Sequence, residues 1–154
     1  MSSDLWSYTL KTYARPGVEP ACLQLQAAGA NVCLLLCAAW LGGRGVACNS
    51  SRLSQLHALA APWHEEVVQP LRQLRTGWRQ AANDDHELKA LREQVKALEL
   101  QAERQLLLRL EALARDWPQA EAEDLWPWVQ GLAAEAANLD RDALQALRVA
   151  VTGA

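Results

Sequence analysis

Cysteine and histidine, the residue types that most often bind metals or act as nucleophiles, form no familiar motif in this chain of 154 residues. The four cysteines are Cys22, Cys33, Cys37 and Cys48. Their spacing lacks the close Cys-x-x-Cys pairs of common zinc sites. Cys33 and Cys37 lie among leucines, where cysteine packs as a small hydrophobic residue. The pattern favours buried free thiols, with a disulfide or a metal site as open alternatives.

The three histidines, His57, His64 and His86, are scattered along the chain. The sequence His64-Glu65-Glu66 has no second histidine four residues after the first, so it is not a zinc-protease helix. A Cys–His pair could meet only in the folded chain, and no feature of the sequence favours one. We therefore expect no catalytic residue, no metal ligand and no cofactor.

Arginines form the strongest candidate for a binding surface. Arg72, Arg75 and Arg79 repeat at helical spacing beside Trp78. These four residues could bind an acidic protein partner, or phosphates with stacking from the tryptophan. The plainer alternatives are a solvated helix face, or pairing with the acidic half of the same chain.

The charge distribution is consistent with the last of these alternatives. Residues 1–82 hold seven basic and four acidic side chains, a balance of +3, whereas residues 83–154 hold eight and fourteen, a balance of −6. Such asymmetry can mark a binding surface or draw the two halves together. A general nucleic-acid binder is normally more basic, so the composition disfavours that class.

The helix that must be most deeply buried is predicted over residues 31–42, because Val32–Leu41 is apolar on every side. Asn31 is a suitable N-cap, and Gly42 or Gly43 can take the left-handed conformation that ends a helix. The apolar run is too short for a membrane span, which needs about 20 residues. We therefore expect a central helix of a protein core and no membrane association.

A long helix is predicted over residues 85–116, capped by Asp84 or Asp85. At about 1.5 Å per residue it would span roughly 48 Å, so part of it should project from the domain. Its expected inward stripe is Leu88, Leu91, Val95, Leu98, Ala102, Leu106, Leu110, Leu113 and Trp117. Leu100 and Leu107 lie on a second face, which suggests contact with the C-terminal helices or with a second chain. They are our candidate oligomer patch.

The remaining chain is predicted to form amphipathic helices that cover the central one. Asn49 and Asp140 are expected N-caps. Ala61-Pro62 should break the pattern, and Pro70 should kink or split the helix that runs from Trp63 to about residue 82. The sequence thus predicts one all-α domain over residues 1–154, a bundle of about six to eight helices.

Several short motifs in the first half of the chain are similar to those of a known family. They are Trp6-Ser-Tyr8, Tyr13-Ala-Arg-Pro-Gly-Val-Glu19, Ala21-Cys-Leu-Gln-Leu-Gln26, Leu34-Leu-Leu36, Trp40-Leu41, Arg44-Gly45, Ala61-Pro-Trp63 and Pro70-Leu-Arg72. Together they resemble an uncharacterised family of short proteobacterial proteins, a domain of unknown function, mainly over residues 4–80. The resemblance implies a bacterial cytoplasmic protein and brings no activity, cofactor or site residue.

The leading interpretation is a non-catalytic α-helical interaction or regulatory protein with an unknown protein partner, and a possible homodimer. The alternative is a small-ligand-binding protein or enzyme whose pocket lies between helices, lined by Trp6, Trp40, Trp63 and cysteines. A weaker alternative is a nucleic-acid-associated factor. A closed core around Trp40 would favour the first interpretation, and a concave pocket with converging polar groups the second.

Overall fold

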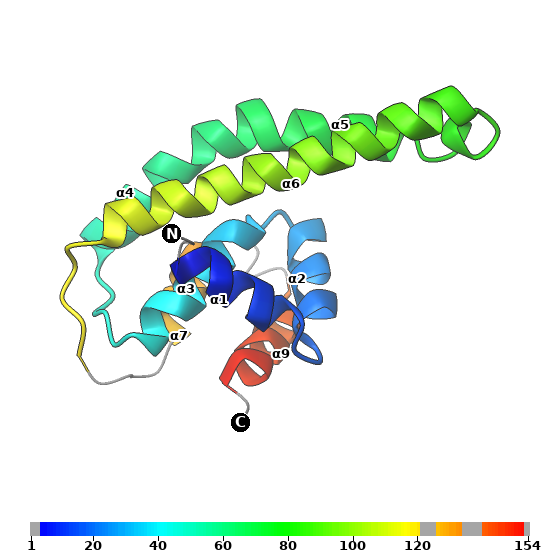
Figure 1. Cartoon of the computed structure of the whole chain (residues 1–154). Coiled ribbons are helices and arrows are strands. Elements are labelled where there is room, and N and C mark those ends of the chain that lie inside the picture. Colours follow the sequence, from blue (N-terminus) through cyan, green and yellow to red (C-terminus); the bar gives the residue numbers. More distant parts are fainter. Residues whose placement is uncertain (1–3, 121–125, 134–139, 153–154) are drawn as a thin grey trace.

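The structure is a computed structural model that describes residues 4–120, 126–133 and 140–152. No strand occurs among these residues, so the predicted all-α fold is confirmed. Two parts are visible in Figure 1, a body of short helices and a long helical hairpin that lies across it. The body contains α1 (Asp4–Tyr13), α2 (Val18–Ala27), α3 (Val32–Gly43), α7 (Trp126–Ala133) and α9 (Arg141–Thr152).

The centre of the body is α3, as the sequence predicts. Every residue from Cys33 to Gly42 is buried, and α3 packs against α1, α2, α4, α6 and α7. The side chain of Asn31 caps the helix by accepting from the backbone N–H of Cys33 at 3.1 Å. The left-handed glycine comes later than expected, because Gly45 has a φ of 70° and neither Gly42 nor Gly43 has a positive φ. The turn therefore closes at Gly45, after Arg44, whose φ of −90° and ψ of 1° lie outside the α-helical region.

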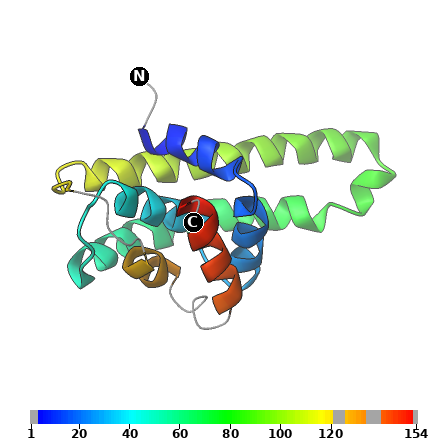
Figure 2. The ribbon, with the colours of Figure 1, turned by 90° about the horizontal axis from the view of Figure 1, so that it is seen from below.

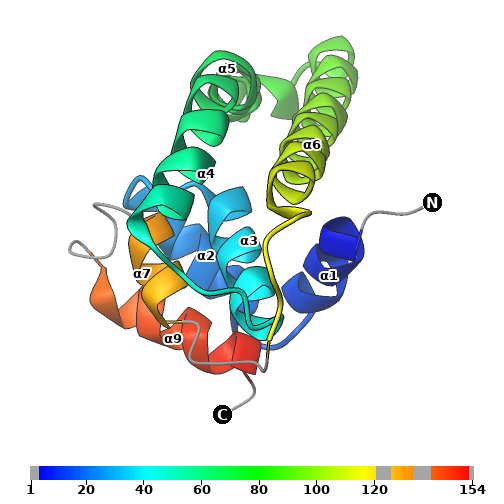
Figure 3. The same ribbon diagram turned by 90° about the vertical axis from the view of Figure 1, so that its left-hand side faces the viewer.

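The hairpin consists of two antiparallel arms joined by a short turn (Figures 1 and 2). The first arm is α4 (Ser50–Trp63), a π-helical turn (His64–Val68) and α5 (Gln69–Gly77), and the second arm is α6 (His86–Ala114). A 3-10 turn (Ala81–Asn83) lies between the two arms. Seen from its end in Figure 3, the hairpin lies above the body with its arms side by side.

The two prolines of the first arm behave differently from each other. The predicted break at Pro62 is wrong, because α4 continues through Pro62 to Trp63. The Nε1–H of Trp63 donates to the carbonyl of Ala102 at 2.9 Å, which holds this segment against α6. Near Pro70 the α-helix is interrupted as predicted, since the π-helical turn ends at Val68 and α5 begins at Gln69, one residue before the proline. In that turn Gln69 bonds to the carbonyl of His64, five residues earlier.

The predicted long helix is confirmed with bounds His86–Ala114, and Asp85 caps it by accepting from the N–H of Leu88 at 3.1 Å. The hairpin tip extends beyond the body (Figures 1 and 2). The inward stripe differs from the predicted one, because Leu91 and Leu98 are 50% and 49% exposed whereas Glu99 is 4% exposed. The rest of the predicted stripe is observed, since Leu88, Val95, Ala102, Leu106 and Leu110 are buried or half-buried, and Arg92 and Glu99 replace Leu91 and Leu98.

Candidate functional site

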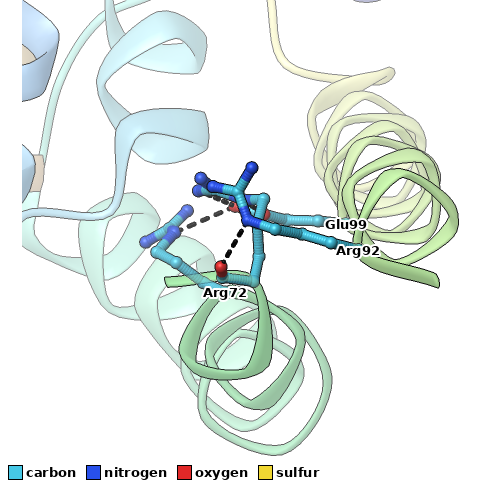
Figure 4. A network of polar contacts seen from close by, with 4 residues as sticks. Arg72, Arg92 and Glu99 are labelled. Atoms are coloured by element: carbon cyan, nitrogen blue, oxygen red, sulfur yellow. Dashed lines mark hydrogen bonds and ion pairs between the residues drawn. The ribbon is translucent and has the colours of Figure 1, made fainter. Parts of the chain in front are cut away.

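A cluster of charged side chains joins the two arms of the hairpin where it crosses the body (Figure 4). Glu99 of α6 accepts from Arg75 Nε at 2.5 Å and from Arg72 Nε at 3.0 Å. Arg92 Nε donates to the carbonyl of Arg75 at 2.8 Å, near the C-terminal end of α5. The side chain of Glu99 is only 6% exposed, and those of the two arginines are 19% and 20% exposed. A carboxylate can be buried this deeply because two guanidinium groups bind it.

The electrostatics of the cluster hold Glu99 in its ionised form. Burial by itself raises the pKa of Glu99, but the hydrogen bonds and charges of Arg75 and Arg72 outweigh burial and leave the pKa below its ordinary value. Within the described part of the chain, Arg72 uses only its Nε in a hydrogen bond. Figure 4 shows this guanidinium group beside the carboxylate of Glu99.

Below this cluster, a cleft of about 490 Å³ lies between the hairpin and the body. Its walls come from α1, α2 and α3 on one side and from α5 and α6 on the other. Polar residues at the cleft are Thr9, Tyr13, Glu19, Gln26, Arg72, Arg75, Glu99 and Glu103, and apolar ones include Trp6, Leu10, Leu23, Val32, Leu36, Leu100 and Leu107. The cleft therefore combines an apolar lining with a few converging polar groups, as binding pockets generally do.

Two polar groups at this cleft, the hydroxyl of Thr9 and the carboxyl of Glu103, are buried without full compensation. Thr9 is 8% exposed, and its hydroxyl oxygen is buried without a hydrogen-bond partner among the described residues. Burial raises the pKa of Glu103 above its ordinary value, and the charge of Arg72 only partly opposes this rise. Buried polar groups normally have partners, so a water molecule or a ligand in the cleft would supply the one that the Thr9 hydroxyl lacks.

The predicted arginine surface is divided by the fold. Arg72 and Arg75 face the cleft and form ion pairs with Glu99. For these two arginines, pairing with the acidic second half of the chain is therefore what the structure shows. Arg79 is exposed outside the cluster, and Trp78 is half-buried at the C-terminal end of α5. The four residues thus do not form one continuous surface.

The candidate oligomer patch needs a correction, because its two leucines lie in different environments. Leu107 is 1% exposed and belongs to the core, whereas Leu100 is 56% exposed. Leu107 is thus buried within the chain, but among the described helices of the body α6 packs mainly on α1 and α3 rather than on the C-terminal helices that the sequence suggested. Leu100 lies at the cleft.

The three tryptophans that the sequence suggested as the lining of one pocket lie in different parts of the structure. Trp6 and Cys33 line the cleft, but Trp40 is buried in the core with the guanidinium of Arg44 over its ring at 4.5 Å. Trp63 packs between the arms, with Arg109 over its ring at 4.0 Å. A closed core around Trp40 and a polar cleft elsewhere therefore occur in the same molecule.

Catalytic chemistry by the thiols is opposed by their surroundings. Cys22, Cys33 and Cys37 are buried, and all four cysteines are free. Burial raises the pKa of Cys37 to about 12 and that of Cys22 to about 12, which disfavours the reactive thiolate. In the described ranges no group of His, Cys, Asp and Glu side chains could hold a metal ion. A search of the same residues finds no helix both long and apolar enough to cross a membrane.

Sequence reasoning missed Glu99, Glu103, Thr9 and Tyr13 as site residues. A signal for Glu99 was present, because Leu88, Arg92, Val95, Glu99, Ala102, Leu106 and Leu110 follow one another at steps of three and four residues. This row is the observed inward face of α6. Glu99 occupies a core position in it, and a carboxylate there requires a basic partner on the facing helix.

Comparison with known proteins places the chain in a family. A family model described as a protein of unknown function (DUF2390) matches residues 4–110, which include the first arm of the hairpin, most of the second arm and all residues that line the cleft. No curated protein and no solved structure is significantly similar to the chain. Because the matched residues make up more than half of the sequence, the chain belongs to this family of proteins of unknown function, DUF2390.

Proposed function

We propose that this protein binds a small organic molecule in the cleft between the hairpin and the body, without catalysing a reaction on it. The observation that carries the proposal is the convergence of Arg72, Glu103 and the unpartnered Thr9 hydroxyl on a cleft of about 490 Å³. Such a volume lies within the range of about 300–1,000 Å³ typical of small-molecule sites. A purely structural ion-pair cluster would not need an adjacent apolar cleft.

The arrangement of the walls suggests how binding would regulate the protein. One wall belongs to the body and the other to the hairpin, so a bound molecule would contact both and stabilise their packing. The proposal is for a bacterial, cytoplasmic, ligand-responsive protein. The cytoplasmic location is supported by the buried free thiols, which suit a reducing compartment.

Blocking the cleft provides the test. Leu100→Trp adds bulk at the cleft, and Leu98→Trp is a matched control because Leu98 is similarly exposed, at 49% against 56%, but does not line the cleft. We expect a metabolite library screened by thermal shift to yield compounds that stabilise the wild type and Leu98→Trp but not Leu100→Trp. If the library yields no stabiliser, or if Leu100→Trp responds like the wild type, the proposal fails.

A second candidate function, self-association, is favoured by the opposite face of the hairpin. Arg72 and Leu100 lie toward the body, so helical geometry places Leu74, Leu91 and Leu98 on the far side. These three leucines are 45%, 50% and 49% exposed. Exposed uncharged residues at heptad spacing continue this face, namely Pro70, Leu74 and Gly77 on α5, Ala81 in the 3-10 turn, and Leu91, Gln94, Leu98, Gln101 and Gln105 on α6, while Glu87 adds a charge at its end.

A second copy of the chain fits this face, because two such hairpins can pack into a four-helix bundle without bringing like charges together. We expect a dimer that Leu91→Glu with Leu98→Glu converts into a folded monomer, measured by light scattering after size-exclusion chromatography. Leu23→Glu with Leu100→Glu, two exposed leucines on the body side, should leave the dimer intact. A wild-type monomer at high concentration would contradict this candidate.

A further inference from the structure

We infer that the ligand of the cleft is an amphipathic monocarboxylate, with its carboxylate at Arg72 and Thr9 and its hydrocarbon part along the apolar walls. This inference rests on the proposed small-molecule site and specifies the chemistry that the site recognises. It is argued from the charge of the cluster, the hydrogen-bonding groups that remain free, and the lining of the cleft.

The charge of the cluster favours an anion. Glu99 is the one carboxylate bound by both Arg72 and Arg75, so these three buried side chains carry one excess positive charge. Arg92 adds a further positive charge beside Arg75. Glu19 and Glu103 also line the cleft, so this excess is confined to the end formed by Arg72 and Arg75, where a carboxylate would neutralise it and an amine would not.

The free donors of Arg72 have the geometry that a carboxylate needs. Its Nε donates to Glu99, and its two terminal nitrogens have no hydrogen-bond partner among the described residues. A guanidinium group presents further N–H donors in a fixed plane, and these bind carboxylates more strongly than neutral acceptors do. Thr9, on α1 in the facing wall, has a buried hydroxyl that can donate to the same ligand.

The side chain of Glu103 does not bind to Arg72 in place of the ligand. Among the described residues it forms no ion pair with Arg72, although both line the cleft. Burial raises the pKa of Glu103, which favours its protonated form relative to an exposed glutamate. Glu103 therefore opposes a bound anion less strongly than an exposed glutamate would.

The rest of the cleft is suited to a hydrocarbon. Its apolar residues surround the polar end from both walls, and they include Trp6, Leu10, Leu23, Val32, Leu36 and Leu100. Leu10, Leu23 and Leu100 are 55%, 50% and 56% exposed, an arrangement that leaves apolar surface in water until a ligand covers it. A purely polar anion such as phosphate would leave this surface uncovered.

Calorimetric titration with three compounds of the same chain length tests the inference. We expect decanoate to bind to the wild type, and decanol and decylamine to bind at least about tenfold more weakly, because each lacks the charge-assisted hydrogen bonds to Arg72. Arg72→Gln should weaken decanoate binding about 20-fold, a loss within the range for hydrogen bonds to charged groups. Arg72→Lys keeps the charge without the planar donors and should give an intermediate loss.

The matched control is Arg79→Gln, which removes an exposed arginine seven residues after Arg72, beyond the end of α5, and should change the affinity less than about twofold. Thermal unfolding of each variant in the absence of ligand shows whether it is folded. Thr9→Val keeps the shape of Thr9 and should also weaken decanoate binding. Equal binding of decanoate to the wild type and a folded Arg72→Gln would overturn the inference.

The inference and the proposed function can fail separately. If decanol or decylamine binds better than decanoate, and Leu100→Trp blocks that binding, the cleft is a ligand site but not one for carboxylates. If decanoate does not bind and the library screen also finds no ligand dependent on Leu100, both the site and its chemistry are wrong.

Discussion

Glu99→Gln is expected to lower the free energy of unfolding by about 2–3 kcal/mol at neutral pH. The change leaves Arg72 and Arg75 without their shared carboxylate, and removing one partner of a buried ion pair costs up to about 5 kcal/mol. The value should be lower here because the arginine side chains keep 19% and 20% exposure to water. Urea unfolding followed by circular dichroism measures the loss. Glu93→Gln, an exposed site on the same helix, should change stability by less than about 0.5 kcal/mol.

The same variant has an expected pH dependence. The pKa of Glu99 is lower in the folded chain than its ordinary value of 4.5, so folding favours its ionised form. This contribution is present above about pH 4.5 and is lost as the pH falls through the lowered pKa of the folded state. The stability difference between the wild type and Glu99→Gln should therefore shrink on acidification below pH 4.5. A difference that stays constant would show that the charge of Glu99 does not stabilise the fold.

Trp128→Ala should have the largest effect on stability, about 4 kcal/mol, as buried aromatic truncations usually cost about 3–5 kcal/mol. Trp128 of α7 is 2% exposed, and its Nε1–H donates to the carbonyl of Val46 at 2.7 Å. Its ring stacks on Trp117 with 6.2 Å between centroids. Denaturant unfolding measures the loss, and Trp126→Ala, at a half-buried position on the same helix, should cost clearly less.

This second prediction concerns residues outside the family match. The match ends at residue 110, yet α7 packs on α3 and α9 packs on α2. The most buried helix of the matched region therefore depends on helices that follow it in the chain. A Trp128→Ala variant as stable as the wild type would show that the matched region holds its core without α7.

Local sequence signals predicted most of the helices because the physics there is local. Continuous apolarity identified α3, and the predicted caps Asn31, Asn49, Asp85 and Asp140 all accept from backbone N–H groups of their helices. The predicted break at Pro62 was wrong. Trp63 donates a hydrogen bond to the carbonyl of Ala102 in the other arm, and a local sequence pattern cannot reveal such a contact between arms.

The candidate site was harder to predict because its central residue violates the usual pattern. In α6 a row containing Leu91 and Leu98 competes with a row containing Arg92 and Glu99, and apolarity alone selects the leucines. The observed choice depends on α5, which supplies the basic partners for Glu99. Pairing across two helices can be recognised only when both faces are known.

The π-helical turn before α5 controls the direction in which the arginines point. A π-helical turn holds one more residue than the corresponding α-helical turn, and one residue corresponds to a rotation of about 100° around the axis. The extra residue in His64–Val68 therefore sets the azimuth of everything that follows it in the first arm. Without it, Arg72 and Arg75 would be turned by about a quarter of the circumference, away from Glu99 and the cleft. The length of this segment, rather than the chemistry of its side chains, thus assembles the charged cluster.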